Sequence, residues 1–388
     1  MKQLATIQTI KSLDPIPEKD RIFLASFEKV DWKVIVGKED FKVGDKCVYI
    51  EYDSVLPQKP EFEFLRARCW SEKWQGFRIR NMKMGTVFSQ GIAFPLSILT
   101  DQYPLHVLSE GIDVTEQLDI VKYDPEALEE AKLIEQHKKY GLFMRFLLRI
   151  PFIKNFLYPT KKRRGNWPEW AHKSDETRVQ ILPYVYETYK GVNVYVTEKL
   201  DGQSSLFGMV SGKFTVCSRN INLPIPSKIK GKYTVEKSKY WQTAEKFNIE
   251  KKLRKANKEL KIDLYIQGEQ CGPAIQDNKL ALPELRFFLY NIFDITHQRY
   301  YNFNETVEFC TIYGFEMVPL IAIKKFDWEN IDQILKYSTG SSYFNTNIPR
   351  EGIVVRSVEN MSPGLWMANI MSFKVVNPDF ELMFYKKE

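Results

Sequence analysis

Short runs of apolar, β-prone residues separated by turn signals fill the first part of the chain. The runs span residues 23–27, 32–36, 47–52, 77–82 and 91–96. Gly, Pro and Asp stand between them, as in Asp14-Pro15, Gly44-Asp45 and Leu56-Pro57. Runs of this length between such residues predict strands. Five short strands within about 100 residues predict a small β-barrel, and an OB-fold is the obvious candidate.

The pattern changes at residue 119 and again at residue 166. Pro125 stands where a helix is expected to begin, and Pro151 is expected to interrupt it. A basic run, Lys161-Lys162-Arg163-Arg164, follows. We expect residues 119–165 to form a helical and basic linker. The helix fits an amphipathic surface helix, and the basic run is either a solvated segment or a contact with nucleic acid.

Strand-like and helix-like patterns are mixed beyond residue 166. Residues 192–200, 204–210 and 213–218 predict three consecutive antiparallel strands, because Asp201-Gly202 and Ser211-Gly212 punctuate them. A pattern rich in Lys and Glu predicts a helix over 240–260. Further strands are expected at residues 264–270, 287–295, 352–355 and 372–376. The predicted fold class is α+β, with domains at residues 1–118 and 166–388 joined by the linker.

Composition narrows the class of protein. The chain has 388 residues, of which 44% are hydrophobic and 27% charged, as in ordinary globular proteins. Its 56 basic and 49 acidic residues give a net charge of +7, which permits a polyanionic partner without demanding one. The scattered cysteines and histidines predict neither a zinc site nor disulfides. The sequence shows no signal-peptide or membrane-spanning pattern, so we expect a cytoplasmic protein with no membrane partner.

The most informative segment is Thr197-Glu198-Lys199-Leu200-Asp201-Gly202. Strand alternation puts Thr197 and Lys199 on one face and Glu198 on the other, just before a tight turn that can approach a phosphate. A lysine with an ordinary pKa is neutral in only about one molecule in a few thousand at pH 7. A nucleophilic Lys199 therefore needs cationic neighbours or a metal ion to lower its pKa. Taken alone, the segment also fits a solvated lysine at a hairpin.

Further segments follow in a fixed order. They are Ser218-Arg219-Asn220, Gly268-Glu269, the aromatic run from Phe287 to Asp294, Arg350-Glu351-Gly352, and Ser372-Phe373-Lys374. Together with the lysine segment, their order and spacing resemble the covalent nucleotidyltransferase superfamily of ATP-dependent polynucleotide ligases and mRNA capping enzymes. The resemblance covers residues 166–388 and implies a domain of ATP-grasp-like antiparallel sheets with helices.

The resemblance implies roles for individual residues around the nucleotide. Lys199 resembles the motif I nucleophile that attacks the α-phosphorus of ATP, and the backbone near Glu198 resembles the edge that reads adenine. Arg219 resembles a contact to the ribose and to the phosphate of the incoming strand. Glu269 resembles the carboxylate that holds the ribose hydroxyl. Phe293 stands where the family stacks an aromatic ring on adenine, with Tyr290 as the alternative.

The resemblance also implies a metal site and a phosphate site. Glu351 resembles the carboxylate that organises a divalent metal ion, and Lys374 resembles a motif V lysine on the α-phosphate. The family usually has two lysines in motif V, two positions apart, whereas Ser372 and Val376 flank Lys374 here. Arg356, or a basic residue of the N-terminal domain, is expected to compensate.

The cations of this set are expected to act on the nucleophile as well. Arg219, Lys374 and Mg²⁺ would repel the charged form of the Lys199 amine, so we expect them to lower its pKa.

The order of the domains narrows the resemblance. DNA ligases and capping enzymes carry an OB domain after motif V, whereas here the barrel-like domain lies in front and few residues follow Lys374. This arrangement is similar to RNA ligases with an N-terminal OB domain, the type found in Naegleria and Deinococcus, with a core like that of phage RNA ligase 2. Phe77-Arg78-Ile79-Arg80 and residues 87–91 resemble their barrel signature, which makes Arg78 and Arg80 candidate nucleic-acid contacts. Ser89-Gln90-Gly91 is either a barrel turn or a functional contact.

The resemblance implies an ATP-dependent RNA ligase that seals 3′-OH and 5′-phosphate ends through lysyl-AMP and RNA-adenylate intermediates. Mg²⁺ or Mn²⁺ is the implied metal cofactor, and nicked duplex RNA bound by a monomer is the implied substrate complex. Two alternatives stay open: a DNA ligase or capping-type nucleotidyltransferase, and a catalytically inactive RNA-binding homologue. The unusual motif V, with Ser372 and Val376 flanking Lys374, keeps the second of these open.

Overall fold

The computed structural model describes residues 3–85, 87–99, 108–123, 167–223, 225–226, 228–229, 232–233, 238–361 and 369–384. The chain divides into two compact units: one of Met1–Tyr140, Val179–Val185 and Pro378–Glu388, the other of Gly141–Arg178 and Tyr186–Asn377. Residues 179–185 and 378–388 thus fall in the first unit, although the sequence placed them in the second domain. The expected linker helix after Pro125 and the basic run at 161–164 lie outside the described residues.

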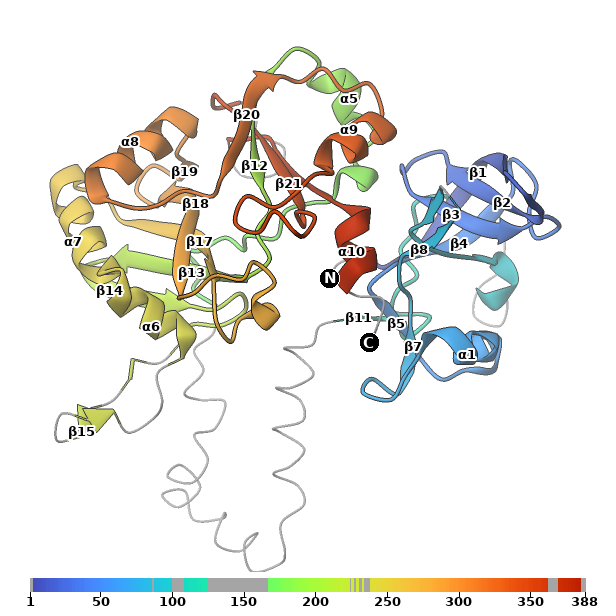
Figure 1. The fold of residues 1–388 in the computed structure, drawn as a ribbon, viewed down its shortest axis with the longest axis horizontal. Helices are drawn as coiled ribbons and strands as arrows, with labels where there is room; N and C mark the ends of the chain where they lie inside the picture. The colour runs from blue at the N-terminus through green and yellow to red at the C-terminus, as the bar shows by residue number, and fades with distance from the viewer. Residues whose placement is uncertain are drawn as a thin grey trace, which may run out of the picture. The chain divides into compact units, whose positions relative to one another are not determined.

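Two antiparallel sheets form the first unit (Figure 1). One has the strand order β10-β4-β1-β2-β3 and the other β11-β5-β7-β6, and β8 pairs with β9. The strands are β1 (Ala5–Ile16), β2 (Lys19–Phe27), β3 (Lys33–Gly37), β4 (Lys46–Glu51), β5 (Ser54–Leu56), β6 (Trp70–Ser71), β7 (Gly76–Arg78), β8 (Met82–Met84), β9 (Val87–Ser89), β10 (Gly91–Pro95) and β11 (Val121–Lys122). Its helices are η1 (Pro60–Leu65), α1 (Arg66–Cys69), η2 (Leu96–Leu99), η5 (Val179–Ile181) and α10 (Pro378–Phe384).

Backbone hydrogen bonds close the first of these sheets into a barrel. The N–H of Gln90 donates to the carbonyl of Lys33 at 2.8 Å, which joins the β9–β10 corner to β3. At that corner, Gly91 has a φ of +133°, and a Cβ there would lie 2.4 Å from the carbonyl oxygen of Ile50. Only glycine fits such a backbone. Residues 89–91 are therefore a barrel turn, and the predicted OB-fold barrel is confirmed.

The longest strand, β1, was not predicted. Asp14-Pro15 resembles a turn in the sequence, but both residues lie within β1 and pair with Leu24 and Phe23 of β2. The other edge of β1 pairs with β4 only over residues 5–9. Pro15 lies beyond that stretch, near the end of β1 and paired on one side only, where proline is tolerated in a sheet.

Aromatic rings fill the barrel. Trp32, Tyr49 and Tyr52 are each at most 3% exposed, and the Tyr49 ring lies 4.9 Å from that of Phe27. The Tyr49 hydroxyl donates to the carbonyl of Gln90 at 2.7 Å, inside the core and at the barrel's closing corner. Packing and closure therefore depend on the same side chain.

The last helix of the chain belongs to this unit. Glu381 in α10 accepts a hydrogen bond from the side-chain amide of Asn81, and Asp379 lies 3.7 Å from the amine of Lys83. These contacts could not be predicted from the sequence, because their partners are about 300 positions apart.

The second unit has two larger antiparallel sheets (Figure 1). Their orders are β20-β12-β21-β22 and β14-β13-β17-β18-β19, and β15 pairs with β16. The strands are β12 (Asn193–Glu198), β13 (Gln203–Val210), β14 (Lys213–Cys217), β15 (Lys228–Ile229), β16 (Lys232–Tyr233), β17 (Leu264–Cys271), β18 (Arg286–Asp294), β19 (Arg299–Tyr300), β20 (Leu320–Lys325), β21 (Gly352–Ser357) and β22 (Ser372–Val376). The helices are α5 (Val185–Thr188), α6 (Lys239–Lys246), α7 (Ile249–Leu260), η6 (Gln276–Asn278), α8 (Phe303–Tyr313) and α9 (Ile331–Ser338).

Helices α6, α7 and α8 cover one face of the five-stranded sheet. Buried residues of these helices, such as Leu253 and Phe309, share a core with Phe207, Ile266 and Leu289 of the sheet. The opposite face of this sheet carries a second buried cluster, which includes Tyr265 and Phe293, and beside it the residues described below as the candidate site. No helix in the described part of the chain is long and apolar enough to cross a bilayer.

Two predictions about this unit are corrected. The strands expected at 192–200, 204–210 and 213–218 are not three consecutive neighbours, because β12 pairs with β20 and β21 while β13 and β14 belong to the other sheet. Asp201-Gly202 thus carries the chain between sheets instead of turning a hairpin. The helix expected over 240–260 is broken into α6 and α7 at Asn248, whose φ of +52° is left-handed.

We predict that Tyr49→Phe destabilises the barrel by about 1–3 kcal/mol, because it leaves the buried carbonyl of Gln90 without its donor. Urea denaturation followed by circular dichroism measures the change. Tyr343→Phe is the matched control, since that ring is 71% exposed and its hydroxyl should be dispensable. Equal stability of the Tyr49→Phe variant and the wild type would show that the closing bond contributes nothing.

Candidate active site

Lys199 directly follows β12, which lies between β20 and β21 in the four-stranded sheet. Its N–H donates to the carbonyl of Gly352 at 3.0 Å. This pairing brings Glu351, the residue before β21, beside the lysine. The Lys199 Nζ donates to Glu351 Oε1 at 2.5 Å, which joins two residues 152 positions apart.

A glycine makes this approach possible. Gly352 has a φ of +156°, and a Cβ there would lie 2.2 Å from the carbonyl oxygen of Val375 on β22. Any side chain would push β21 and β22 apart at the point where Glu351 is positioned.

Carboxylates surround the Lys199 amine. Its burial lowers the pKa, but the charges of Glu351, Glu269 and Asp201 outweigh that effect and raise the pKa above its usual value. The expectation that Arg219 and other cations lower it is wrong for the protein without nucleotide or metal. The nearest charges to the amine are negative, so Lys199 is protonated in this state.

The carboxylates also act on one another. Burial raises the pKa of Glu269 to about 8; the Glu351 and Asp201 charges add to the rise, and Lys199 opposes it. Burial likewise raises the pKa of Glu351. Like charges close together in a partly buried place resist ionisation. The cluster can therefore accommodate added positive charge.

The sequence analysis missed the pairing of Asp201 with Lys279. The Lys279 Nζ lies 2.8 Å from Asp201 Oδ2, and both side chains are less than 10% exposed. Asp201 was expected only as part of the turn that follows Lys199, with no role at the site. Lys279 lies in the loop after β17, and its sequence context gave no signal.

Glu198 faces away from Lys199, as strand alternation predicts. Its side chain is 3% exposed, and its Oε2 accepts the N–H of Tyr343 at 2.8 Å. Burial raises the pKa of this carboxyl. The side chain therefore positions the loop that carries Tyr343, and only the backbone of Glu198 is near the lysine.

Arg219 lies just beyond β14, near Glu269. Its Nη2 lies 2.6 Å from Asp175 Oδ1, and about a third of its side chain is exposed. Its charge counteracts the rise in the pKa of Glu269, which places the guanidinium close to the carboxylate cluster.

The structure contradicts the role expected for Phe293. The ring is 1% exposed, stacks on Tyr265 with centroids 5.1 Å apart, and is closed in by Tyr300 and His172. A ring enclosed in this way has no free face for a base. A bulge in β18 explains the change, because one extra residue, Tyr290, lies between the residues that pair with Gly268 and Gln267.

Tyr290, the alternative to Phe293, lies nearer to the carboxylates. It is half-buried, its hydroxyl lies 2.6 Å from that of Ser204, and Ser204 pairs with Glu269 across the sheet. The charge of Glu269 contributes to a raised pKa of the Tyr290 hydroxyl, although burial is the main cause. The alternative aromatic ring therefore lies beside the carboxylate cluster.

Motif V places one lysine and one serine on the same face. Lys374 pairs with Val354 across β21 and β22, and its charge counteracts the rise in the pKa of Glu351. Ser372 pairs with Arg356, whose Nε donates to the serine hydroxyl at 3.0 Å.

Arg356 therefore contacts Ser372, one of the two residues that flank Lys374 in motif V. It is 3% exposed, and its guanidinium lies 2.6 Å from Glu176 and 5.6 Å from the centre of the Tyr290 ring. That Arg356 compensates for the absent second lysine of motif V stays a prediction, and the charge of Arg356 is shared with Glu176.

Arg78 in the first unit is not placed to contact RNA. Its side chain is 3% exposed, and the guanidinium lies 3.4 Å above the ring of Tyr123 and 3.7 Å from Asp53. The expected nucleic-acid contact through Arg78 is therefore wrong, because this side chain packs on Tyr123 and lies near Asp53 within the first unit. Arg80 is half-buried and remains a candidate.

The residues around Lys199 fit a divalent cation that arrives with phosphate. Glu351 Oε2 is buried and has no hydrogen-bond partner among the described residues. Within the same residues, no three His, Cys, Asp or Glu side chains are arranged to hold a metal ion by themselves. Mg²⁺ commonly binds through one or two carboxylates and completes its shell with water and phosphate oxygens. The donor set suits that mode of binding.

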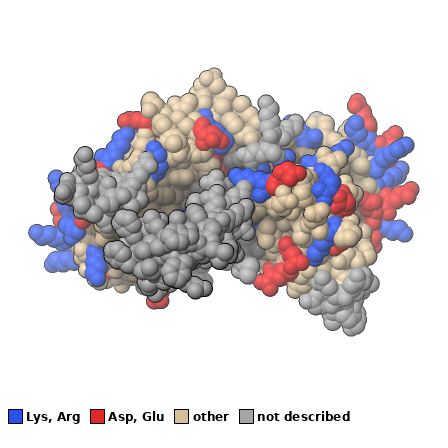
Figure 2. All heavy atoms as spheres, turned by 90° about the horizontal axis from the view of Figure 1, so that it is seen from below, with Lys and Arg blue, Asp and Glu red and all other residues tan. Residues whose placement is uncertain are grey.

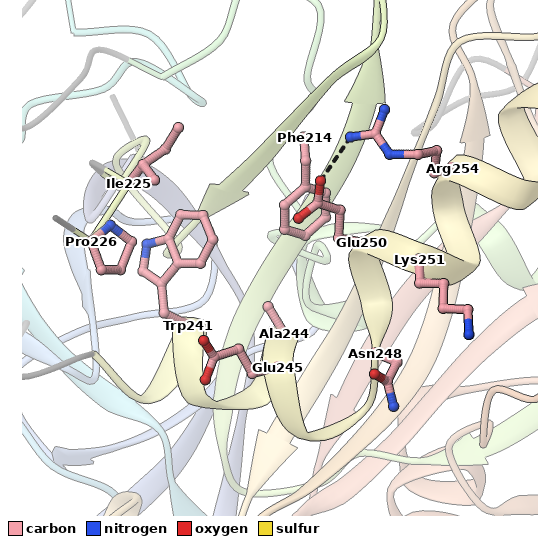
Figure 3. Close-up of a pocket in the computed structure, with 10 residues that line it drawn as sticks. All are labelled: Phe214, Ile225, Pro226, Trp241, Ala244, Glu245, Asn248, Glu250, Lys251 and Arg254. Atoms are coloured by element: carbon pink, nitrogen blue, oxygen red, sulfur yellow. Dashed lines mark hydrogen bonds and ion pairs between the residues drawn. The ribbon is translucent and has the colours of Figure 1, made fainter. Parts of the chain in front are cut away.

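A separate cavity of about 610 Å³ lies in the second unit, beside α6 and α7 (Figure 3). Its lining residues are Phe214, Ile225, Pro226, Trp241, Ala244, Glu245, Asn248, Glu250, Lys251 and Arg254. None of the residues that the sequence singled out for catalysis belongs to it.

Two separate parts of the chain match known protein families. Residues 192–376 match the RNA ligase family, and residues 4–96 match a family described as an OB-fold domain. Residues 192–376 belong to the RNA ligase family, and with the N-terminal barrel they define an RNA ligase with an N-terminal OB-fold domain. A comparison with curated protein sequences finds no match.

The chain is also similar to solved structures of Naegleria gruberi RNA ligase. The structure with PPi has 25% identity and a TM-score of 0.76, with 100% of both chains covered. A lysine-to-methionine mutant with AMP and Mn has 25% identity and a TM-score of 0.77 over the same coverage. A lysine-to-alanine mutant with ATP and Mn gives the same identity and TM-score over 99% of this chain and 100% of the other.

We predict that Glu269→Gln stabilises the protein without nucleotide and metal increasingly as pH rises. The folded protein holds the Glu269 proton up to about pH 8, whereas the unfolded chain releases it near 4.5, so wild-type stability falls across this window. Glutamine has no such proton. The melting temperature of the variant should exceed that of the wild type by roughly 3 °C or more at pH 8, and by less at pH 5.

Thermal melts in EDTA at the two pH values measure the difference. Glu187→Gln, at an exposed position, is the control and should shift neither melt. A difference between Glu269→Gln and wild type that does not change with pH would contradict the raised pKa.

Proposed function

We propose that the chain seals a 3′-OH to a 5′-phosphate at nicks in duplex RNA or RNA-containing duplexes, using ATP and a divalent metal ion. The observation that carries the proposal is the Lys199 amine at the end of β12, 2.5 Å from Glu351 and surrounded by Glu269 and Asp201. The similar Naegleria gruberi RNA ligase has been solved with ATP and Mn and with AMP and Mn, which supports ATP as the donor.

The first proposed step charges the enzyme. The neutral Lys199 amine attacks the α-phosphorus of ATP, an N–P bond forms, and the P–O bond to pyrophosphate breaks. The amine loses its proton to solvent. Because the carboxylates keep this amine protonated, the step needs positive charge beside them before the amine can react.

Two transfers then complete the proposed reaction. An oxygen of the RNA 5′-phosphate attacks the AMP phosphorus and displaces Lys199, which yields RNA-adenylate. The 3′-OH attacks the 5′-phosphate phosphorus, the phosphodiester forms, and AMP leaves.

Neighbouring residues hold the substrate in this proposal. Tyr290 stacks on adenine and Glu269 accepts a ribose hydroxyl, since both lie on the open face of the five-stranded sheet. Lys374 neutralises an oxygen of the α-phosphate, and Arg219 binds the ribose and the incoming 5′-phosphate.

Glu351, with Asp201 beside it, would hold the divalent metal ion. When bound, the metal neutralises developing charge on phosphate oxygens. Glu351 also affects the protonation of Lys199. Once a cation shares the Glu351 carboxylate, that carboxylate no longer stabilises the protonated form of the Lys199 amine.

The N-terminal barrel supplies the grip on duplex RNA in this proposal. Recognition of A-form RNA relies on phosphate and 2′-OH contacts and on helix shape, with little readout of sequence. Arg80 is the candidate contact left in the barrel signature. The protein acts as a monomer in the cytoplasm in this proposal.

We predict that Lys199→Ala separates the steps. With ATP and a nick carrying a plain 5′-phosphate, the variant should seal at least 1,000-fold more slowly than wild type, roughly the loss of an essential nucleophile. With a nick carrying a preformed 5′-adenylate, it should keep activity within roughly ten-fold, because the last step does not use the amine. Lys190→Ala, on the surface, is the control for both substrates. Loss of both activities in Lys199→Ala alone would contradict the assigned role.

We predict a preference among substrates. A panel of duplexes nicked in RNA–RNA, RNA–DNA and DNA–DNA strands, with free single-stranded RNA, should rank nicked RNA duplexes first by kcat/KM. An all-DNA nick sealed as fast as the RNA nick would favour a DNA ligase. Faster joining of free ends would overturn the proposed nick.

A further inference from the structure

Positive charge is concentrated in one stretch of the second unit. Residues 228–261 contain 12 Lys and Arg and four Glu, a net charge of +8, whereas the whole chain carries +7. The rest of the chain is therefore close to neutral. A local excess of this size favours a polyanionic ligand at this surface.

Helix α7 presents much of this charge to solvent. Its buried side holds Ile249, Leu253 and Ala256. Lys251 and Lys258 are exposed, and neither makes an ion pair within the described part of the chain. Figure 2 shows Lys and Arg side chains gathered at the left end of the molecule, where α7 lies in Figure 1.

An aromatic cavity adjoins this charge (Figure 3). Trp241 lies between Pro226 and Phe214, and its ring is 6.0 Å from that of Phe214 at 75°. Ile225 lies on the same side and is 74% exposed to solvent, which is energetically unfavourable for a large apolar side chain. Arg254 stands on the opposite rim, held 2.7 Å from Glu250. The cavity thus offers a flat ring and apolar walls beside unpaired lysines.

We propose that this cavity and the exposed face of α7 bind a single-stranded segment of RNA, outside the site around Lys199. An unpaired base stacks on Trp241 against Ile225, and Lys251 and Lys258 contact the phosphates on either side. Aromatic rings next to cations are the usual platform for single-stranded nucleic acid. The choice of RNA rests on the proposed function. The site would hold a single-stranded stretch of the same RNA beyond the nicked duplex.

Binding of a labelled 12-nucleotide single-stranded RNA, followed by fluorescence anisotropy over a range of KCl concentrations, tests the proposal. Lys251→Ala with Lys258→Ala should lower the slope of log affinity against log salt by about 1.4, since each phosphate contact on a single strand contributes about 0.7. Trp241→Ala should weaken binding about ten-fold. Ile225→Glu should do the same by placing an anion in the cavity.

Ile225→Glu keeps the test valid if Trp241→Ala misfolds, because an exposed side chain can be changed without disturbing the core. Lys190→Ala with Lys325→Ala, two exposed lysines elsewhere in this unit, is the matched control and should leave the slope unchanged. Unchanged affinity in Ile225→Glu and an unchanged slope in the α7 double variant would overturn the proposal.

Transfer of AMP from ATP to the protein is measured in parallel without RNA. It should be unaffected in every variant of this site, because none of these residues contacts the Lys199 cluster. Absence of AMP transfer in the wild type would instead count against the proposed ligase function, so the two failures are distinguishable.

Discussion

The contact between the Lys199 amine and Glu351 is the constraint on which the second unit depends. It exists because β12 pairs with β21, and the neighbouring pairing of β21 with β22 needs Gly352, where a side chain would meet the carbonyl of Val375. The lysine ends the central strand of one sheet, and Glu269 and Tyr290 reach the same place from the other sheet. The fold thereby brings together carboxylates that would repel one another if the Lys199 amine did not balance their charge.

That balance gives the site a resting state. The carboxylates hold the Lys199 amine protonated and unreactive. The charged amine in turn lowers the free-energy cost of burying two charged carboxylates. In the proposed mechanism, positive charge that arrives with a phosphate-bearing substrate weakens the hold of the carboxylates on the amine proton. The nucleophilicity of Lys199 is then linked to substrate binding by electrostatics.

The sequence was sufficient to predict residues whose role is suggested by a short segment of the chain. It was insufficient where the pairing of strands decides which side chains meet. Lys199 and Glu351 could be predicted, because each lies in a short segment whose residue types carry a recognisable role. Tyr290 could not be preferred to Phe293, because a one-residue bulge changes which ring leaves the core and sequence periodicity does not reveal it. Lys279 was missed since its loop reaches Asp201 only in three dimensions.

Mapping AMP onto the protein would decide whether Lys199 is the nucleophile. Purified protein is digested before and after incubation with ATP and Mg²⁺, and the peptides are sequenced by mass spectrometry. The structure predicts AMP on the Lys199 side chain and on no other residue, and none in Lys199→Ala. AMP on a different residue, or an unmodified Lys199 under both conditions, would contradict the assignment.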